Sequence, residues 1–169
     1  MKRIGIIGVV VAAVLAPAAA LGADQPSPTA KLSAQRDCRQ QLSQMGAAVF
    51  KASYGGAANA MGKCVSKFAR LEQANLQSAS SSCQKERAGD AAAFRAKYGV
   101  GGLGKCVSAQ ARAAAQKEVS AVVAAAKACA AERRADAAAF RAKYGSGPQK
   151  ANAFGRCVNA AASAGANSG

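Results

Sequence analysis

The feature that most constrains the fold of this chain is a segment that occurs three times, each time with two cysteines. The first cysteines of the copies are Cys38, Cys83 and Cys129, so the period is about 45 residues, which is typical of a repeated supersecondary unit. Each copy continues with Phe-x-x-x-Tyr-Gly and closes with Gly-Lys-Cys-Val or Gly-Arg-Cys-Val. A serine cluster at residues 78–82 indicates the boundary between the first two copies. The pattern predicts three repeat units and a flexible tail, at residues 38–82, 83–128, 129–164 and 165–169.

Residues 1–22 have the layout of a secretory signal peptide. A basic start is followed by an apolar run over residues 4–16 and then by small residues, which is the order of regions in such peptides. The run is too short for a membrane anchor, the less favoured alternative, which needs about 20 apolar residues. We expect cleavage after Gly22, with Ala20 and Ala23 as alternative sites, and a mature chain that is secreted or held in the cell envelope.

Export determines how the six cysteines are interpreted. An even number of cysteines in a small exported chain is typical of a disulfide framework. A zinc site is not favoured, because the chain has no histidine and no Cys-x-x-Cys segment. Pairing within each copy uses all six cysteines, whereas pairing between neighbouring copies would leave Cys38 and Cys157 single. The predicted bonds are Cys38–Cys64, Cys83–Cys106 and Cys129–Cys157, and neither a metal nor another cofactor is expected.

Residues 23–37 are predicted to be a polar, proline-containing linker and the lead-in to a helix. Composition and periodicity both predict that the helix begins within this segment, at Leu32. Alanine dominates, with Lys, Arg, Gln and Glu between the alanines, and these are strong helix formers. In the second copy Cys83, Phe94 and Tyr98 follow helical spacing and share one face. The glycine after each tyrosine is typical of a helix C-terminus. The predicted fold is therefore all-α, an array of three disulfide-stapled helical hairpins.

Helical spacing and disulfide pairing conflict within each copy. A continuous helix from Cys83 to Tyr98 would separate the two residues by about 22 Å. Cys106 follows after only a short loop, and a disulfide requires Cα atoms about 4.4 to 6.8 Å apart. Either the loop over residues 99–104 returns along the helix, or the helix breaks near the first cysteine. Residues 105–144 contain no Gly or Pro and could form one helix or two.

The chain is strongly basic, with 23 Lys and Arg against 8 Asp and Glu and a net charge of +15. Such an excess attracts nucleic acid, anionic lipid or an acidic wall polymer. Solubility alone would explain the amount of charge but not its sign. Basic residues gather around the three predicted turns, so we expect an anionic polymer (wall polymer, lipid surface or nucleic acid) to bind there. The candidate contacts are Lys51, Lys63, Arg95, Lys97, Lys105, Arg141, Lys143 and Arg156.

A tyrosine ends the first predicted helix of each copy, at Tyr54, Tyr98 and Tyr144, and each lies beside basic residues. The rings could stack against the base or sugar of a ligand. The favoured interpretation instead places Phe and Tyr in the core of the hairpin, with Lys and Arg in solvent.

No residues in the sequence point to catalysis. Without histidine the chain has no Ser-His or Cys-His pair. The pairs Glu86/Asp90 and Glu132/Asp136 are interpreted as charges on a helix surface rather than as an acid and a base. The glycine-rich segment at residues 99–105 lacks the spacing and the preceding strand of a phosphate-binding loop. We therefore expect a protein that is not an enzyme, with a small hydrolase as a remote alternative.

The string Cys…Glu-Arg…Phe-Arg-Ala-Lys-Tyr-Gly…Gly-Arg-Cys-Val resembles repeats of alanine-rich exported proteins of actinobacteria, a functionally uncharacterised group. The resemblance extends from Cys38 to about Ala162 and is best in the third copy. The first copy departs from it, with Gln41-Leu42 in place of Glu-Arg and Ser53 in place of Lys. The resemblance implies export and a helical repeat, and it carries no catalytic residue.

These features predict an exported, non-enzymatic, basic helical-repeat protein that binds anionic envelope polymers or acts structurally at the cell surface. The alternative is an extracellular nucleic-acid-binding or antimicrobial-type polycation. Binding to purified wall polymer and to DNA at matched salt would separate the two. The sequence does not indicate the oligomeric state.

Overall fold

The computed structural model describes residues 25–56, 58–147 and 150–166. These residues form helices and no β-strand, so the predicted all-α class is confirmed. The helices are α1 (Pro28–Met45), α2 (Ala47–Ser53), α3 (Ala60–Gly89), α4 (Ala91–Tyr98), α5 (Gly102–Ala135), α6 (Ala137–Tyr144) and α7 (Ala153–Ala166). The predicted signal peptide and its cleavage sites lie outside the described residues, and so does the end of the predicted tail, whereas Gly165 belongs to α7. No helix in the described ranges is long and apolar enough to cross a membrane.

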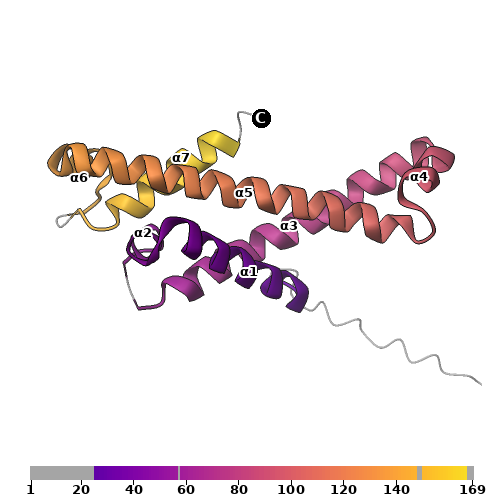
Figure 1. Ribbon diagram of the computed structural model, residues 1–169, viewed down its shortest axis with the longest axis horizontal. Helices are drawn as coiled ribbons and strands as arrows, with labels where there is room; N and C mark the ends of the chain where they lie inside the picture. Colours follow the sequence, from indigo (N-terminus) through magenta and orange to yellow (C-terminus); the bar gives the residue numbers. More distant parts are fainter. Residues whose placement is uncertain (1–24, 57, 148–149, 167–169) are drawn as a thin grey trace, which may run out of the picture.

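Four main helices follow one another in a zigzag. α3 packs against α1 and α5, and α5 packs in turn against α7 (Figure 1). A short helix stands at each reversal: α2 between α1 and α3, α4 between α3 and α5, and α6 between α5 and α7. We call α2, α4 and α6, each with the loop that follows it, the first, second and third tip.

The three disulfides join consecutive main helices and confirm the predicted pairing. The Cα atoms of each pair are 6.0 to 6.1 Å apart, within the range that a disulfide permits. The bonds are Cys38–Cys64 between α1 and α3, Cys83–Cys106 between α3 and α5, and Cys129–Cys157 between α5 and α7. No cysteine is free.

Two aspartates break the helices and remove the conflict between helical spacing and disulfide pairing. Asp90 and Asp136 have extended backbone, with φ of −147° and −150°, and end α3 and α5. Each carboxylate then accepts hydrogen bonds from two backbone N–H groups of the next helix, at 2.9 to 3.0 Å. An aspartate at this position caps a helix N-terminus and complements its dipole. Residues 105–144 are therefore two helices, α5 and α6, and the chain folds back at the break.

Two predicted boundaries differ from the structure. The first helix begins at Pro28 rather than Leu32, because the Ser27 hydroxyl accepts a hydrogen bond from the Ala30 N–H and proline suits the first turn. The serine cluster at residues 78–82 lies inside α3 and not at a break. The helix continues there because its serines lie mostly on the outer face, while Ala79 and Cys83 are buried on the inner one.

The repeated copies share their helices. α3 carries both Cys64 and Cys83, and α5 carries both Cys106 and Cys129, so each long helix contains the end of one copy and the start of the next. The copies are thus overlapping segments of one continuous zigzag rather than separate hairpins.

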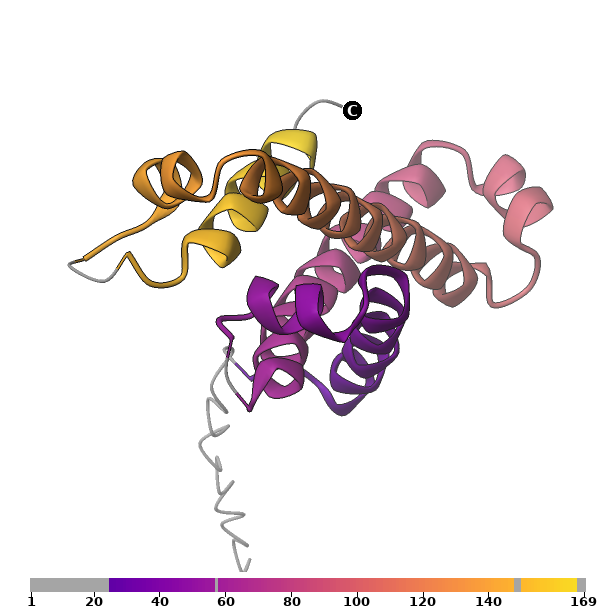
Figure 2. The ribbon, with the colours of Figure 1, turned by 60° about the vertical axis from the view of Figure 1, so that its left-hand side comes forward.

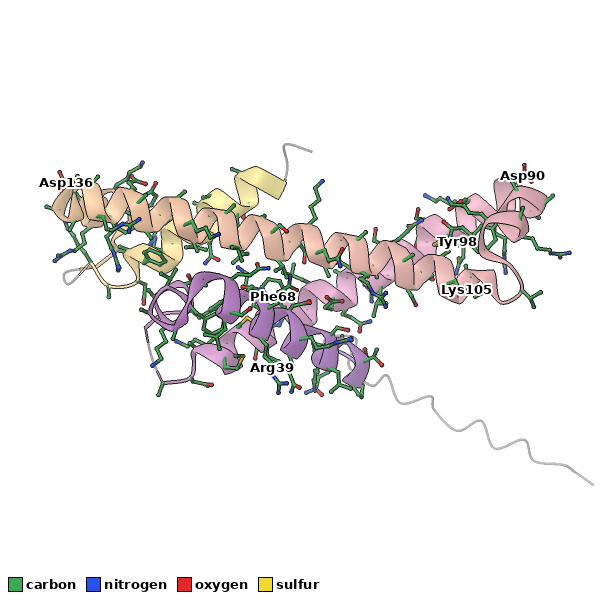
Figure 3. All side chains as sticks on the ribbon, in the orientation of Figure 1. Arg39, Phe68, Asp90, Tyr98, Lys105 and Asp136 are labelled. Atoms are coloured by element: carbon green, nitrogen blue, oxygen red, sulfur yellow. A yellow bond between two sulfur atoms is a disulfide. The ribbon has the colours of Figure 1, made fainter. Side chains whose placement is uncertain are left out.

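The buried residues form two unequal clusters. The larger one fills the space between α1, α2, α3, α5 and α7 around the fully buried Phe68, which Figure 3 labels near the middle of the molecule. The smaller one contains only Cys83, Phe94 and Cys106, with three partly buried neighbours. The second tip accordingly projects from one end of the body, in contact with α3 and α5 alone (Figure 2).

Candidate anion-binding surface

A carboxylate on the preceding helix holds the second and third tips in the same way. In the second tip, Glu86 accepts hydrogen bonds from the Tyr98 hydroxyl at 3.4 Å and from the Lys97 ammonium at 2.9 Å. In the third tip, Glu132 accepts from Tyr144 at 3.1 Å and from Lys143 at 2.9 Å. The glutamates are therefore structural acceptors. With Asp90 and Asp136 serving as helix caps, neither predicted carboxylate pair is arranged as an acid and a base.

The first tip replaces both partners of this interaction. Its tyrosine, Tyr54, donates to the amide oxygen of Gln41, which stands where the other copies have glutamate. Ser53 stands where they have lysine. Gln41 is fully buried, and an unpaired carboxylate would be costly in that place. The two departures noted in the sequence therefore remove both charges together, and the Ser53 hydroxyl donates to the Val49 carbonyl oxygen instead.

The aromatic residues of the tips are structural, in agreement with the favoured interpretation of the tyrosines. The ring centroids of each Phe–Tyr pair are 4.8 to 4.9 Å apart. The ammonium groups of Lys97 and Lys143 lie 4.9 and 4.8 Å from the ring centres of Tyr98 and Tyr144. Contacts with the tyrosine and the glutamate raise the pKa of both lysines above its ordinary value. These two lysines already have an anionic partner, so they are weaker candidates for binding a polyanion.

The three tips do not form one surface. α5 has 34 residues and is therefore about 50 Å long, with the second tip at its start and the third at its end. Figure 3 shows Asp90 and Asp136, which begin α4 and α6, at opposite ends of the molecule. The first tip instead contacts α7. A Cβ added at Gly155 of α7 would lie 3.0 Å from the Ser53 carbonyl oxygen, so the two backbones approach closely.

The predicted basic contacts divide among these places. Lys63 and Arg156 meet where the first tip joins α7. The remaining six, also exposed, do not meet there: Lys51 lies on α2 of the first tip itself, and the others are Arg95 and Lys97 in α4, Lys105 in α5, and Arg141 and Lys143 in α6.

A pocket of about 320 Å³ lies at this junction. It contains the cations Lys63, Lys67 and Arg156 and no carboxylate. Its lining comes from the end of the first tip (Ser53, Tyr54, Gly55), from α3 (Lys63, Lys67) and from α7 and the residue before it (Asn152, Gly155, Arg156, Asn159). Outside the two Lys–Glu pairs of the second and third tips, the described residues form no ion pair, so these three cations have no carboxylate partner.

A larger groove of about 630 Å³ continues from this pocket along α3. It shares Lys63 and Lys67 with the pocket and adds Arg70, all on one helix face. Lys67 and Arg70 were not among the contacts predicted from the sequence, although their spacing from Lys63 by four and then three residues is the pattern of a helix face. We call the pocket and this groove together the basic groove.

The environment of Lys67 shows how little negative charge the basic groove holds. Its ammonium group donates a hydrogen bond of 2.6 Å to the side-chain oxygen of Asn159, a neutral acceptor. Burial of the ammonium group lowers the pKa of Lys67, and attraction to Glu118 opposes this in part. Lys67 is therefore attracted to Glu118 but forms no ion pair of the kind that Lys97 and Lys143 form.

Carboxyl groups gather in the interior instead, where α1, α3 and α5 meet. Asp37, Glu72 and Glu118 come from these three helices in turn. Burial, with a hydrogen bond and repulsion from Asp37, raises the pKa of Glu72 to about 7. Burial raises the pKa of Glu118 as well. Of the three, Glu72 is buried, and Asp37 and Glu118 are partly exposed. No group of His, Cys, Asp and Glu in the described ranges is arranged to hold a metal ion.

No protein-family model, curated protein sequence or solved structure matches the chain. Its class therefore follows from its own fold and surface. It is an all-α protein cross-linked by three disulfides, which indicate an oxidising, extracellular environment.

Proposed function

We propose that the protein is an exported, non-enzymatic binding protein that attaches to anionic polymers of the cell envelope. The observation that carries this proposal is the meeting of Lys63, Lys67, Arg70 and Arg156 in one groove without a carboxylate partner. The four positive charges repel one another, and an anionic polymer that binds along the groove would reduce this repulsion.

The remaining predicted contacts would extend the bound polymer beyond the basic groove. Arg141 lies on the third tip, while Arg95 and Lys105 lie at the far end of the molecule. A long polymer could reach several of these cations at once, so that total affinity exceeds that of the groove alone.

The absence of an enzyme-like site supports a binding role. The chain has no histidine. Of the described acidic residues, Glu86 and Glu132 hold tyrosines, and Asp90 and Asp136 cap helices. Asp37, Glu72 and Glu118 lie between the main helices. None of them lines the basic groove, whereas Asp37 and Glu72 line a separate pocket with Arg36 and Arg112.

The test is the affinity of the disulfide-bonded protein for a poly(glycerol phosphate) wall polymer, measured at several salt concentrations. If four cations neutralise polymer charges, the slope of log K against log salt should be on the order of −3. Replacing Lys63, Lys67, Arg70 and Arg156 by Gln should flatten that slope. Weak binding that does not respond to salt would contradict the proposal and make the charge a device for solubility.

A nucleic acid is the second candidate partner, because the groove along α3 could follow a phosphate backbone. Duplex DNA measured under the same salt conditions separates the two candidates. Tighter binding to DNA than to the wall polymer at every salt concentration would favour the extracellular nucleic-acid-binding alternative. Little sequence preference is expected in that case, since contacts to phosphates carry no sequence information.

A further inference from the structure

We propose that the pocket between α2, α3 and α7 is a discrete, saturable site for a single phosphate group. This inference rests on the proposed function and deepens it, because it names the chemical group of the polymer that the protein recognises and the place where it binds. The group is a terminal phosphate monoester, and the rest of the basic groove would guide the polymer that extends from it.

The pocket brings together cations that are unfavourable neighbours without an anion. Lys63 lies in the first turn of α3 and Arg156 in the first turn of α7. The N-terminal end of a helix carries partial positive charge, so a cation in the first turn is on the unfavourable side of the helix dipole. Lys67, one turn further along α3, adds a third positive charge. A phosphate monoester in the pocket would offset about two of these three positive charges and would suit the two helix ends.

The polar groups of the pocket suit an anion rather than a cation. Asn159 uses its side-chain oxygen to accept from Lys67, which leaves its NH₂ group to donate to a ligand. Asn152 holds a left-handed backbone, with φ of 62°, and its side-chain oxygen, an acceptor, lies near Gly55 together with the Lys63 ammonium. The hydroxyl of Tyr54 is turned away to Gln41.

Charge and size both favour phosphate over other anions. A phosphate monoester carries a charge of about −1.5 to −2 at neutral pH and three strong acceptor oxygens, which matches three separate cationic donors. A carboxylate has one charge and two oxygens, so it would leave two of the three positive charges uncompensated, against about one for a phosphate monoester. A pocket of about 320 Å³ is large enough for one phosphate and its neighbouring carbons but not for a folded partner.

The repeats of the chain supply a matched control. Lys105 occupies the same place before the second cysteine as Lys63 and Arg156 do in their copies. Its ammonium group lies against Gly99 much as that of Lys63 lies against Gly55, at 3.6 and 3.1 Å from an added Cβ. Lys105 and the nearby Arg95 are exposed at the second tip, far from the pocket. Their replacement removes the same charge from the protein but leaves the pocket intact.

The experiment titrates the disulfide-bonded protein with inorganic phosphate, glycerol phosphate and acetate at constant ionic strength, followed by amide chemical shifts. Saturable binding of both phosphates, with shifts centred on residues of the pocket and only weak binding of acetate, is the expected result. The double variant Lys63→Gln/Arg156→Gln should weaken phosphate binding about tenfold or more, since charged donors are lost. The control Lys105→Gln/Arg95→Gln should stay within about twofold of the wild type. Circular dichroism checks that both variants remain folded, and Lys63→Arg/Arg156→Lys should keep binding.

The outcomes separate this inference from the proposed function. Equal weakening in the pocket variant and the control, or shifts that never saturate, would overturn the pocket even if the wall polymer still binds in a salt-dependent way. Saturable phosphate binding without any polymer binding would keep the pocket, overturn the proposed function and identify free phosphate or a small phosphate ester as the ligand. Polymer binding that weakens more in the pocket variant than in the control supports both, because Arg95 and Lys105 contact only the outer part of the polymer.

Discussion

At the scale of single residues, one position determines how each tip is held. This position lies three residues after the first cysteine of each copy. Gln41, Glu86 and Glu132 occupy it, and all three accept a hydrogen bond from the tyrosine of their tip. Glutamate occurs where a lysine also reaches the site, and glutamine occurs where serine replaces the lysine. The charge at this position therefore follows the presence of its counter-charge.

The first prediction reverses this pairing. Gln41→Glu should destabilise the protein by about 1 to 3 kcal/mol, because a fully buried carboxylate would have no cation beside it. Glu132→Gln makes the opposite change at the equivalent, partly exposed position of the third tip, and it should cost much less because solvent screens that pair. Chemical denaturation of both variants gives the two free energies of unfolding. Equal costs would contradict the idea that burial without a counter-charge selects glutamine in the first copy.

The second prediction concerns Glu72 and pH. Burial and the neighbouring Asp37 raise its pKa in the folded protein to about 7, above the ordinary value for glutamate. The folded protein therefore binds a proton more tightly than the unfolded chain does. The stabilisation is fully present below the ordinary pKa of about 4.3 and is lost as pH rises through 7. Thermal melting should show a lower midpoint at pH 8.5 than at pH 5.5.

The variant Glu72→Gln tests whether this residue is the cause. Other charged groups face the same region, namely Arg36 and Asp37 from α1, Lys67 from α3, and Arg112 and Glu118 from α5. They remain in the variant, so any pH dependence that they cause would persist. We expect the melting temperature of Glu72→Gln to change less between pH 5.5 and pH 8.5 than that of the wild type. An unchanged slope would assign the effect to another group.

At the scale of the secondary-structure element, each Gly-Lys-Cys-Val or Gly-Arg-Cys-Val segment lies at the start of a helix. The glycines of these segments differ in the space around them. An added Cβ would lie 3.0 Å from the Ser53 carbonyl oxygen at Gly155 but would meet nothing within 4 Å at Gly104. The glycine of the third copy therefore permits the contact between α7 and the first tip. This contact also forms one side of the proposed phosphate pocket.

The third prediction compares these two glycines. Gly155→Ala should destabilise the protein by about 1 to 3 kcal/mol, because the backbone of α7 must move away from the first tip. Gly104→Ala should be neutral or stabilise by up to about 1 kcal/mol, since alanine is the better helix former and the site is open. Thermal melting of the two variants measures the difference. A similar effect at both positions would mean that the close approach at Gly155 carries no energetic weight.

The sequence predicted the elements better than their boundaries and their placement. Helical periodicity and the even cysteine count identified the all-α fold and the three bonds, because both depend on local spacing. The breaks at Asp90 and Asp136 were not located, because aspartate inside an alanine-rich run is a weaker terminator than Gly or Pro. The pocket could not be predicted either. It depends on the first tip meeting α7, which lies about a hundred residues further along the chain.

The whole molecule consists of a body and one projecting arm. The body contains the large buried cluster, to which α1, α3, α5 and α7 all contribute. The arm is the second tip with the adjoining ends of α3 and α5, and its buried cluster contains three residues, two of them the cysteines of one disulfide. The arm therefore depends on its disulfide far more than the body depends on either of the others.

The last prediction removes disulfides one at a time. In Cys83→Ser/Cys106→Ser the closed loop of 23 residues is lost, a change worth about 3 kcal/mol in the chain-entropy model, in a region with almost no other buried apolar contact. Amide hydrogen exchange should show loss of protection over residues 84–105, with the amides of α1 and α7 unchanged. In Cys38→Ser/Cys64→Ser the lost bond lies within the large cluster. There we expect a lower global melting temperature without selective opening of any tip. Selective opening of the first tip in this second variant, or uniform loss of protection in the first, would show that the body and the arm do not differ in this way.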